Sequence, residues 1–230
     1  MSGYLGLGGN EELVDVTRYH EALLLNMIGE FDASMEILAS LVGRGVVPDN
    51  LKLAIGLTLL RVPLLPAQVD PCKDALIHTA GEIGELTAQA NFDHAESAFQ
   101  QALRDYPDTP FLHYAYGSML ATLARFDEAE ARFQVEIRIS PDGPAAYMQL
   151  GHVYLRIDGS QDAVGPARQG LKLAPHLFAS HYLLGRALLE LGNTNQAIPE
   201  LETARRGHAT AGLRFFLRIH REEGVLFRGG

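Results

Sequence analysis

The sequence predicts an all-α fold, a solenoid of stacked antiparallel helix hairpins that is irregular near its N-terminal third. Three columns of residues predict it, because alanines, prolines and glycines each recur at intervals of 34 residues. A period of roughly 20–50 residues is typical of stacked supersecondary units and not of one closed core. The members of the three columns are Ala95, Ala129, Ala163 and Ala197; Pro107, Pro141 and Pro175; and Gly117, Gly151 and Gly185.

The first third of the chain is the least regular part. Residues 1–11 are expected to form a flexible tail, because the glycine-rich run GYLGLGGN has no strand before it and no Lys-Ser/Thr after it, unlike a phosphate-binding loop. Residues 12–75 are expected to begin with a degenerate hairpin that turns near Gly29. The run LKLAIGLTLL then predicts one extra helix without a clear partner before a proline-rich turn.

Residues 76–211 form the regular part, and each of its units is expected to contain two helices. In one unit, Tyr116, Leu120 and Leu123 share a helical face, and a second apolar stripe follows after a short break. The prolines end the second helices because proline lacks the amide hydrogen and clashes with the preceding turn. The small residues allow two helices to approach closely. The four units are 76–109, 110–143, 144–177 and 178–211.

The run AAYMQLGHVY, followed by AV and a proline, resembles the tetratricopeptide repeat, a helix-turn-helix unit of about 34 residues. Leu150 and Gly151 match the Leu-Gly pair of that signature, Ala163 matches its small residue and Pro175 its final proline. One departure is Ile83, which stands where the motif has glycine.

The resemblance covers residues 76–211 strongly and 12–62 weakly. It implies a right-handed solenoid of five to six hairpins, whose first helices line a concave groove that accepts an extended peptide or a helix of another protein. Carried over by the period, it places these residues in the groove: Tyr114, Ser118, Met148, His152, Arg156, Tyr182, Arg186 and Leu189.

The composition of the groove suggests what it binds. Its aromatics provide contact area and its arginines provide directed hydrogen bonds. Arg156, Arg186 and a protonated His152 would make it locally positive, so a partner segment with carboxylates is expected. The alternative is an ordinary solvated surface without one dominant ligand. A known sub-class of the family clamps the carboxyl terminus of chaperones with Lys and Asn, but Tyr114, Ser118 and Met148 stand here instead.

The C-terminal residues 212–230 are expected to form a capping helix and a tail, since a solenoid needs a terminal helix with one polar face. Residues 204–230 carry six arginines against two glutamates. A basic docking patch for an acidic partner is therefore the alternative.

Several kinds of chemistry find no support. The formal charge of −9 argues against a nucleic-acid partner, because neutralising phosphates needs clustered cations. The single cysteine, Cys72, excludes an internal disulfide framework. None of the nine histidines forms an HxxxH or HExxH motif, and His113 and His181 are interpreted as packing residues. We therefore expect no cofactor, no metal and no enzymatic activity.

The function expected from these observations is a non-catalytic scaffold that binds a protein or peptide in its groove. The chain shows no signal peptide and no transmembrane segment, so a cytoplasmic protein without a membrane partner is expected. A monomer is favoured. Two alternatives stay open: an enzyme or small-molecule binder that uses the irregular region 56–90, and a self-assembling structural protein.

Overall fold

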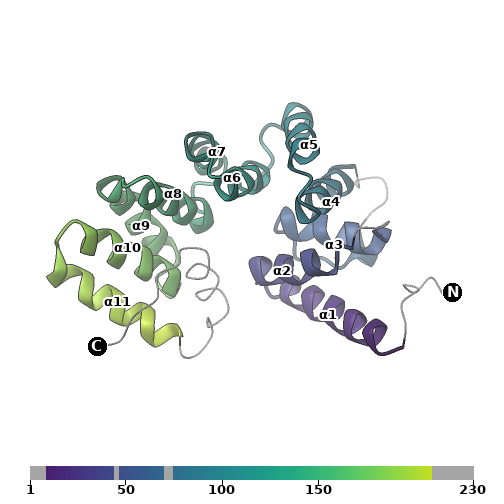
Figure 1. Cartoon of the computed structure of the whole chain (residues 1–230), viewed down its shortest axis with the longest axis horizontal. Coiled ribbons are helices and arrows are strands. Elements are labelled where there is room, and N and C mark those ends of the chain that lie inside the picture. The colour runs from purple at the N-terminus through teal and green to yellow at the C-terminus, as the bar shows by residue number, and fades with distance from the viewer. Residues whose placement is uncertain (1–8, 44–46, 70–74, 209–230) are drawn as a thin grey trace. The chain divides into compact units, whose positions relative to one another are not determined.

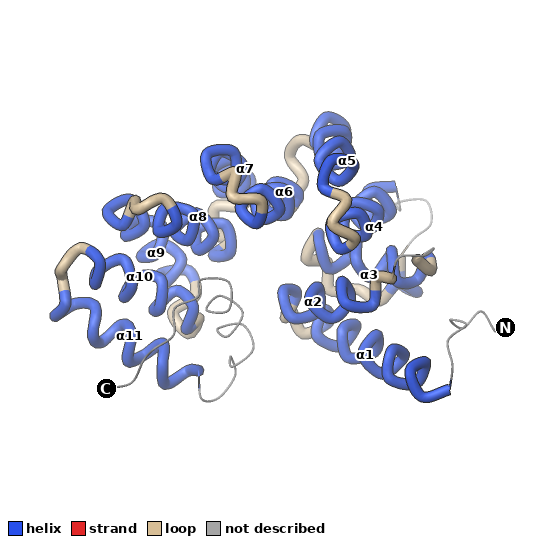
Figure 2. Tube along the Cα trace, viewed as in Figure 1, coloured by secondary structure: helices blue, strands red, loops and turns tan. Residues whose placement is uncertain are grey.

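The computed structural model describes residues 9–43, 47–69 and 75–208 (Figure 1). Within these ranges the chain consists of helices and loops without a strand, as Figure 2 shows, which confirms the predicted all-α fold. None of the described helices is both long and apolar enough to cross a bilayer. The helices are α1 (Gly9–Met27), α2 (Phe31–Leu41), α3 (Asp49–Leu59), α4 (Ala75–Ala88), α5 (Phe92–Asp105), α6 (Leu112–Thr122), α7 (Phe126–Ile139), α8 (Pro144–Arg156), α9 (Ser160–Leu173), α10 (Phe178–Glu190) and α11 (Thr194–His208), with a short 3-10 helix, η1 (Pro66–Gln68), after α3.

The chain divides into two compact units, and the boundary falls within α6. Unit 1 is Met1–Tyr116 and contains α1 to α5 with the first part of α6. Unit 2 is Gly117–Gly230 and contains the rest of α6 with α7 to α11.

Unit 2 consists of regularly spaced hairpins. Its second helices begin at Phe126, Ser160 and Thr194, at intervals of one repeat. Helix α10 packs against α8, α9 and α11, so consecutive hairpins stack on one another. The alanine column lies inside this stack, where Ala129, Ala163 and Ala197 are each 0% exposed. The stacked hairpins that the period predicts are therefore confirmed here.

The prolines and the turns keep the same period. Helices α5, α7 and α9 each end two residues before the proline that closes their repeat. Each turn from a first to a second helix contains a residue in the left-handed conformation, which closes a helix by accommodating the Schellman arrangement of hydrogen bonds. These residues are Ala90, Ala124, Asp158 and Gly192, with φ of 56°, 57°, 58° and 76°. The sequence did not reveal this column, because its members are of three residue types and alanine, which fills two of the four positions, rarely adopts the left-handed conformation.

The glycine column lies where side chains of other helices come close. A Cβ at Gly117 would lie 2.8 Å from the ring of Phe133, and one at Gly185 would lie 2.7 Å from Leu201. These contacts join the two helices of one hairpin, as expected. At Gly151 the nearest side chain is Leu183 of α10, so this glycine also allows one hairpin to stack on the next.

Unit 1 is organised differently, because α3 pairs with α4 across a long connection. The two helices run in opposite directions at their contact, since Lys52 faces Gly81 and Glu85 while Gly56 faces Ile77. A Cβ at Gly56 would meet the carbonyl oxygen of Ile77, and one at Gly81 would meet that of Lys52. The helix that seemed to lack a partner therefore has one later in the chain.

The departure at Ile83 follows from the same pairing. Ile83 is 0% exposed and stands at the position of the missing glycine. The glycines of α4 are Gly81 and Gly84 instead, and both face α3, where Gly84 meets Ile55. In α4 the small residues thus allow contact with the preceding helix.

Candidate functional site

Six of the predicted groove residues lie on α8 and α10, two first helices that pack against each other in unit 2. Because the helices are one repeat apart, Met148 and Tyr182 occupy equivalent positions, as do His152 and Arg186. All four are half-buried. The positions next to them in both helices are buried and hold the hairpins together: Leu150, Gly151, Leu184 and Gly185.

Arg186 is already engaged with an acidic side chain of its own helix. Its Nε donates to Oε1 of Glu190 at 3.1 Å, and Ser160 donates from its hydroxyl to the other carboxylate oxygen. Glu190 is the only acidic residue of α10, and α8 has none. The two helices therefore carry a formal charge of +1, although the chain as a whole carries −9.

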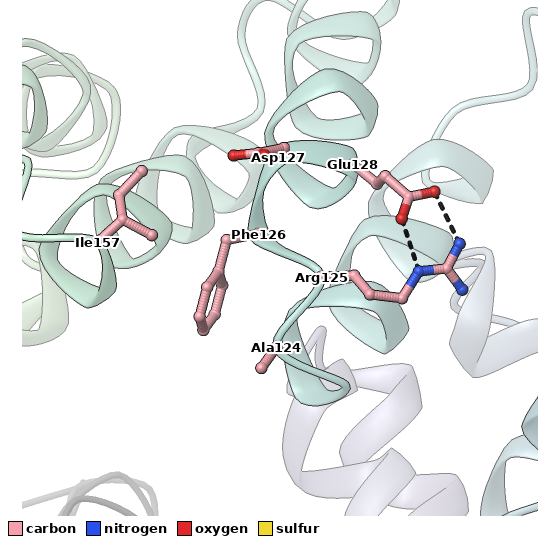
Figure 3. A pocket seen from close by; sticks show the side chains of 6 residues that line it. All are labelled: Ala124, Arg125, Phe126, Asp127, Glu128 and Ile157. Atoms are coloured by element: carbon pink, nitrogen blue, oxygen red, sulfur yellow. Dashed lines mark hydrogen bonds and ion pairs between the residues drawn. The ribbon is translucent and has the colours of Figure 1, made fainter.

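Arg156, at the end of α8, lies over an aromatic ring. Its guanidinium carbon is 5.2 Å from the ring centroid of Phe126, within the range of a cation–π interaction. Phe126 also lines an open hollow of about 260 Å³, together with Ile157 (Figure 3). Arg125 and Glu128 also belong to its lining, and Arg125 donates two hydrogen bonds of 2.7 Å to the carboxylate of Glu128. The lining of this hollow thus includes both apolar and charged residues.

Of two further predicted residues, Met148 is engaged in packing and Leu189 is exposed. Met148 accepts a hydrogen bond of 3.1 Å from the Ser180 hydroxyl and lies against Gly170, so it lies between three helices. Leu189 is 48% exposed, whereas Leu155, its equivalent one repeat earlier, is 5% exposed in the cluster formed by α8, α9, α10 and α11. The exposure of Leu189 is thus a property of the last described hairpin.

The other two predicted residues lie on α6. Ser118 is half-buried, and its carbonyl accepts a hydrogen bond from the Thr122 hydroxyl. Tyr114 belongs to unit 1, where its ring centroid is 4.7 Å from the guanidinium carbon of Arg61. The structure therefore gathers six of the predicted residues on α8 and α10 and places Tyr114 in a separate cluster.

Sequence reasoning missed Arg61, the centre of that cluster. Its Nη2 donates to Oδ1 of Asp32 at 2.9 Å. Burial lowers the pKa of the Arg61 guanidinium, but the neighbouring Tyr114 and Asp32 raise it, so that the pKa lies above its ordinary value. These residues come from three distant segments without a shared period, and no pattern in the sequence connects them.

A buried polar network in unit 1 was also missed. Ser34 donates to the carbonyl oxygen of Ala22 at 2.8 Å, and Thr58 donates to the side-chain oxygen of Asn26 at 3.1 Å. The amide nitrogen of Asn26 donates in turn to the carbonyls of Val62 and Leu64. The network therefore satisfies backbone groups that the chain exposes after α3.

The two packing histidines hold equivalent positions. Nε2 of His113 and of His181 lies 3.2 Å and 3.1 Å from the carbonyl oxygens of Pro107 and Pro175. His181 also lies 2.6 Å from Glu200 through Nδ1. Both rings thus join a first helix to the loop before it, which agrees with their interpretation as packing residues.

Tyrosine–glutamate pairs connect successive hairpins. Tyr154 of α8 donates to Oε1 of Glu130 in α7 at 2.8 Å. Tyr116 of α6 donates to Oε1 of Glu96 in α5 at 2.7 Å, and Glu96 stands one repeat before Glu130. Burial raises the pKa of the Tyr154 hydroxyl, and its hydrogen bond to Glu130 adds to the rise. Tyr154 is therefore a neutral donor that links two hairpins.

No group of His, Cys, Asp and Glu that could hold a metal ion occurs among the described residues. Some expectations concern residues outside the described ranges: residues 1–8 of the N-terminal tail, Cys72, the capping helix at residues 212–230 and residues 209–230 of the basic patch. Residues 9–11 were expected to belong to the flexible tail, but they are the first residues of α1.

Comparisons with known proteins bear on the fold and the family. The family model described as tetratricopeptide repeat matches residues 85–144 and 148–216, more than half of the chain. Among solved structures, MamA 41-end from Desulfovibrio magneticus RS-1 is 13% identical over 89% of this chain and 98% of that chain, with a TM-score of 0.52. Another MamA crystal structure is 16% identical over 80% and 92%, with a TM-score of 0.51. At these identities the likeness shows the fold alone. A search of curated proteins finds no match.

Proposed function

The chain belongs to the tetratricopeptide repeat family, and from this membership we propose that it is a non-catalytic scaffold that binds a protein or peptide segment along α8 and α10. Stacked helical repeats generally offer extended surfaces for protein partners. One observation carries the assignment to these helices. Tyr182 and Arg186 stay half-exposed on a helix whose other positions are mostly buried, and His152 does so one repeat earlier.

A partner with carboxylates fits this surface best. Arg156 and Arg186 are its charged donors, and Glu190 is the one acidic group that accompanies them on α8 and α10. A carboxylate of the partner would compete with Glu190 for Arg186. The hollow between Phe126 and Ile157 lies beside Arg156 and suits an apolar side chain of the same segment.

The experiment is a selection of peptides from a random display library on the full chain. Dissociation constants of the selected peptides are then measured by fluorescence anisotropy. We expect enrichment of Asp and Glu, and binding at least about tenfold weaker in the double variant Tyr182→Ala/Arg186→Ala, a loss of about 1.4 kcal/mol. Circular dichroism should show unchanged helicity.

Arg168→Ala is the matched control, since Arg168 is an exposed arginine on α9, outside α8 and α10. It should bind the peptides as tightly as the wild type. If the double variant also retains full affinity, the peptides bind elsewhere and the assignment to α8 and α10 is wrong.

The competition with Glu190 gives a sharper test of the carboxylate. Glu190→Gln removes the negative charge next to Arg186 and keeps a similar shape. We expect it to strengthen binding of the acidic peptides by about threefold to tenfold, because each tenfold change corresponds to about 1.4 kcal/mol. Weaker binding would mean that Glu190 itself contacts the partner.

The alternative of a catalytic or small-molecule site at residues 56–90 has less support. In the described part of this region, Gly56 and Gly81 join two helices, and the carbonyls of Val62 and Leu64 accept hydrogen bonds from Asn26. These groups serve the fold. The proposed scaffold is a monomer, and light scattering of the purified chain distinguishes it from a self-assembling protein.

A further inference from the structure

Three aromatic rings and one carboxylate surround the guanidinium of Arg61 in unit 1. Its central carbon lies 4.7 Å from the ring centroid of Tyr114, 5.3 Å from that of Phe111 and 5.7 Å from that of Phe31. Asp32 accepts its hydrogen bond at 2.9 Å. Significant cation–π contacts occur about once per 70–80 residues, so three rings on one cation are a concentrated arrangement.

The backbone around Arg61 is held from both sides. Arg61 has a φ of 54°, and the N–H of Val62 donates to the carbonyl of Leu57 at 2.8 Å, which closes α3 as in the regular turns. The carbonyl of Val62 then accepts a hydrogen bond of 2.9 Å from Asn26. The side chain of Arg61 is thereby directed toward the rings, and it is only 15% exposed.

The rings and the carboxylate come from two other elements. Phe31 and Asp32 are the first two residues of α2, whereas Phe111 and Tyr114 lie at the start of α6. Phe111 and Tyr114 also meet edge to face at 6.4 Å. A planar guanidinium can stack on such rings while it donates to a carboxylate, which a compact ammonium group cannot do equally well.

We propose that Phe31, Asp32, Phe111 and Tyr114 form a guanidinium-binding cage whose resident ligand is Arg61, and that this ligand fastens the start of α6 to α2 and α3. Because Tyr114 belongs to this cage, the proposed partner-binding surface consists of residues of unit 2 alone. This inference is independent of the proposed function, because it concerns contacts within unit 1.

The test is chemical rescue of the full chain carrying Arg61→Ala. This variant keeps the turn, since Ala90 and Ala124 occupy the same turn position with almost the same φ. We expect its Tm to fall by roughly 5 °C. Methylguanidinium at millimolar concentration should bind the vacated cage and restore part of that loss, because a ligand of the folded state alone stabilises it.

Three controls decide the outcome. Methylammonium at the same concentration should not raise the Tm of Arg61→Ala, and methylguanidinium should not raise the Tm of the wild type. Rescue should also disappear in the double variant Arg61→Ala/Asp32→Asn. Equal effects of the two cations, or an unchanged Tm in Arg61→Ala, would overturn the proposal.

Arg61→Lys provides a second, milder variant. It keeps the positive charge and the turn but loses the plane that stacks on the rings. We expect its Tm to lie between those of the wild type and Arg61→Ala. A Tm equal to that of the wild type would show that any cation suffices, and the cage would then have no preference for a guanidinium.

Discussion

Two glycines of the α3–α4 pair in unit 1 differ from the glycine column of unit 2 in what they contact, whereas a third, Gly84, faces the side chain of Ile55. In unit 2, a Cβ added at Gly151 or Gly185 would lie 2.7 Å from a side chain, that of Leu183 or Leu201. In unit 1, Gly56 and Gly81 face backbone carbonyl oxygens of the opposite helix. The α3–α4 contact is thus a direct approach of two backbones, whereas the stacked hairpins are separated by side chains.

This difference determines where the chain tolerates a larger side chain. A side chain can rotate or shift when a neighbour grows, but a helical backbone cannot move without separating the helices. The regular hairpins therefore accept variation at most positions, as their turn residues show. The α3–α4 pair depends on two glycines that no period requires.

The largest effect is expected for Gly81→Ala. Its Cβ would meet the carbonyl oxygen of Lys52, so α3 and α4 would have to move apart. We expect a loss of about 3 kcal/mol or more in the free energy of unfolding, at the upper end for overpacking, which exceeds the gain in helix propensity of about 1 kcal/mol. Urea unfolding measures the loss, and hydrogen exchange should locate it in unit 1.

Gly165→Ala is the control for this variant. Gly165 lies inside α9, and a Cβ there would meet nothing within 4 Å apart from its chain neighbours. Pro166 follows directly, and its ring disfavours the helical conformation of a preceding residue with a Cβ, which offsets the higher helix propensity of alanine, so the free energy of unfolding should change by less than about 1 kcal/mol. If Gly81→Ala had an equally small effect, the close backbone approach of α3 and α4 would be wrong.

A smaller loss is expected for Gly185→Ala in unit 2. Its Cβ would lie 2.7 Å from Cγ of Leu201, which can adjust by rotation. We expect a loss of about 1 kcal/mol by urea unfolding, with faster hydrogen exchange in α10 and α11. A loss as large as that of Gly81→Ala would remove the contrast between side-chain and backbone contacts.

The regular hairpins could be predicted from the sequence because their contacts recur. Ala129 and Ala163 are buried for the same reason in successive repeats, so a single column of the sequence predicts the burial of both. The pairing of α3 with α4 could not be predicted, since Gly56 and Gly81 fall outside the 34-residue period and their contact is not repeated. The only indication of this pairing in the sequence is Ile83, which stands where the glycine column has glycine.

For the candidate site, the sequence predicts which positions are equivalent but not which contacts their side chains make. The period identifies Tyr182 and Arg186 as equivalents of Met148 and His152, and the structure places these helices together. What the period cannot show is which side chains are already engaged. The contacts of Arg186 with Glu190 and of Tyr114 with Arg61 join residues through space, and they depend on side-chain conformations that no sequence spacing encodes.

The smallest effect concerns the turns, where the regular hairpins share one backbone conformation with different residues. Ala124 has a φ of 57°, which is unfavourable for a residue with a Cβ by about 1 kcal/mol or more. Ala124→Gly removes this strain but loosens the unfolded chain, which costs part of the gain. We expect a net gain of about 0.5 kcal/mol in the free energy of unfolding, seen as a rise of roughly 1–2 °C in Tm.

Gly192→Ala makes the reverse change at the equivalent turn. A Cβ there would meet nothing within 4 Å, so backbone strain is the main effect of the substitution and the Tm should fall. If both variants shifted the Tm in the same direction, backbone conformation would not be what distinguishes these turns.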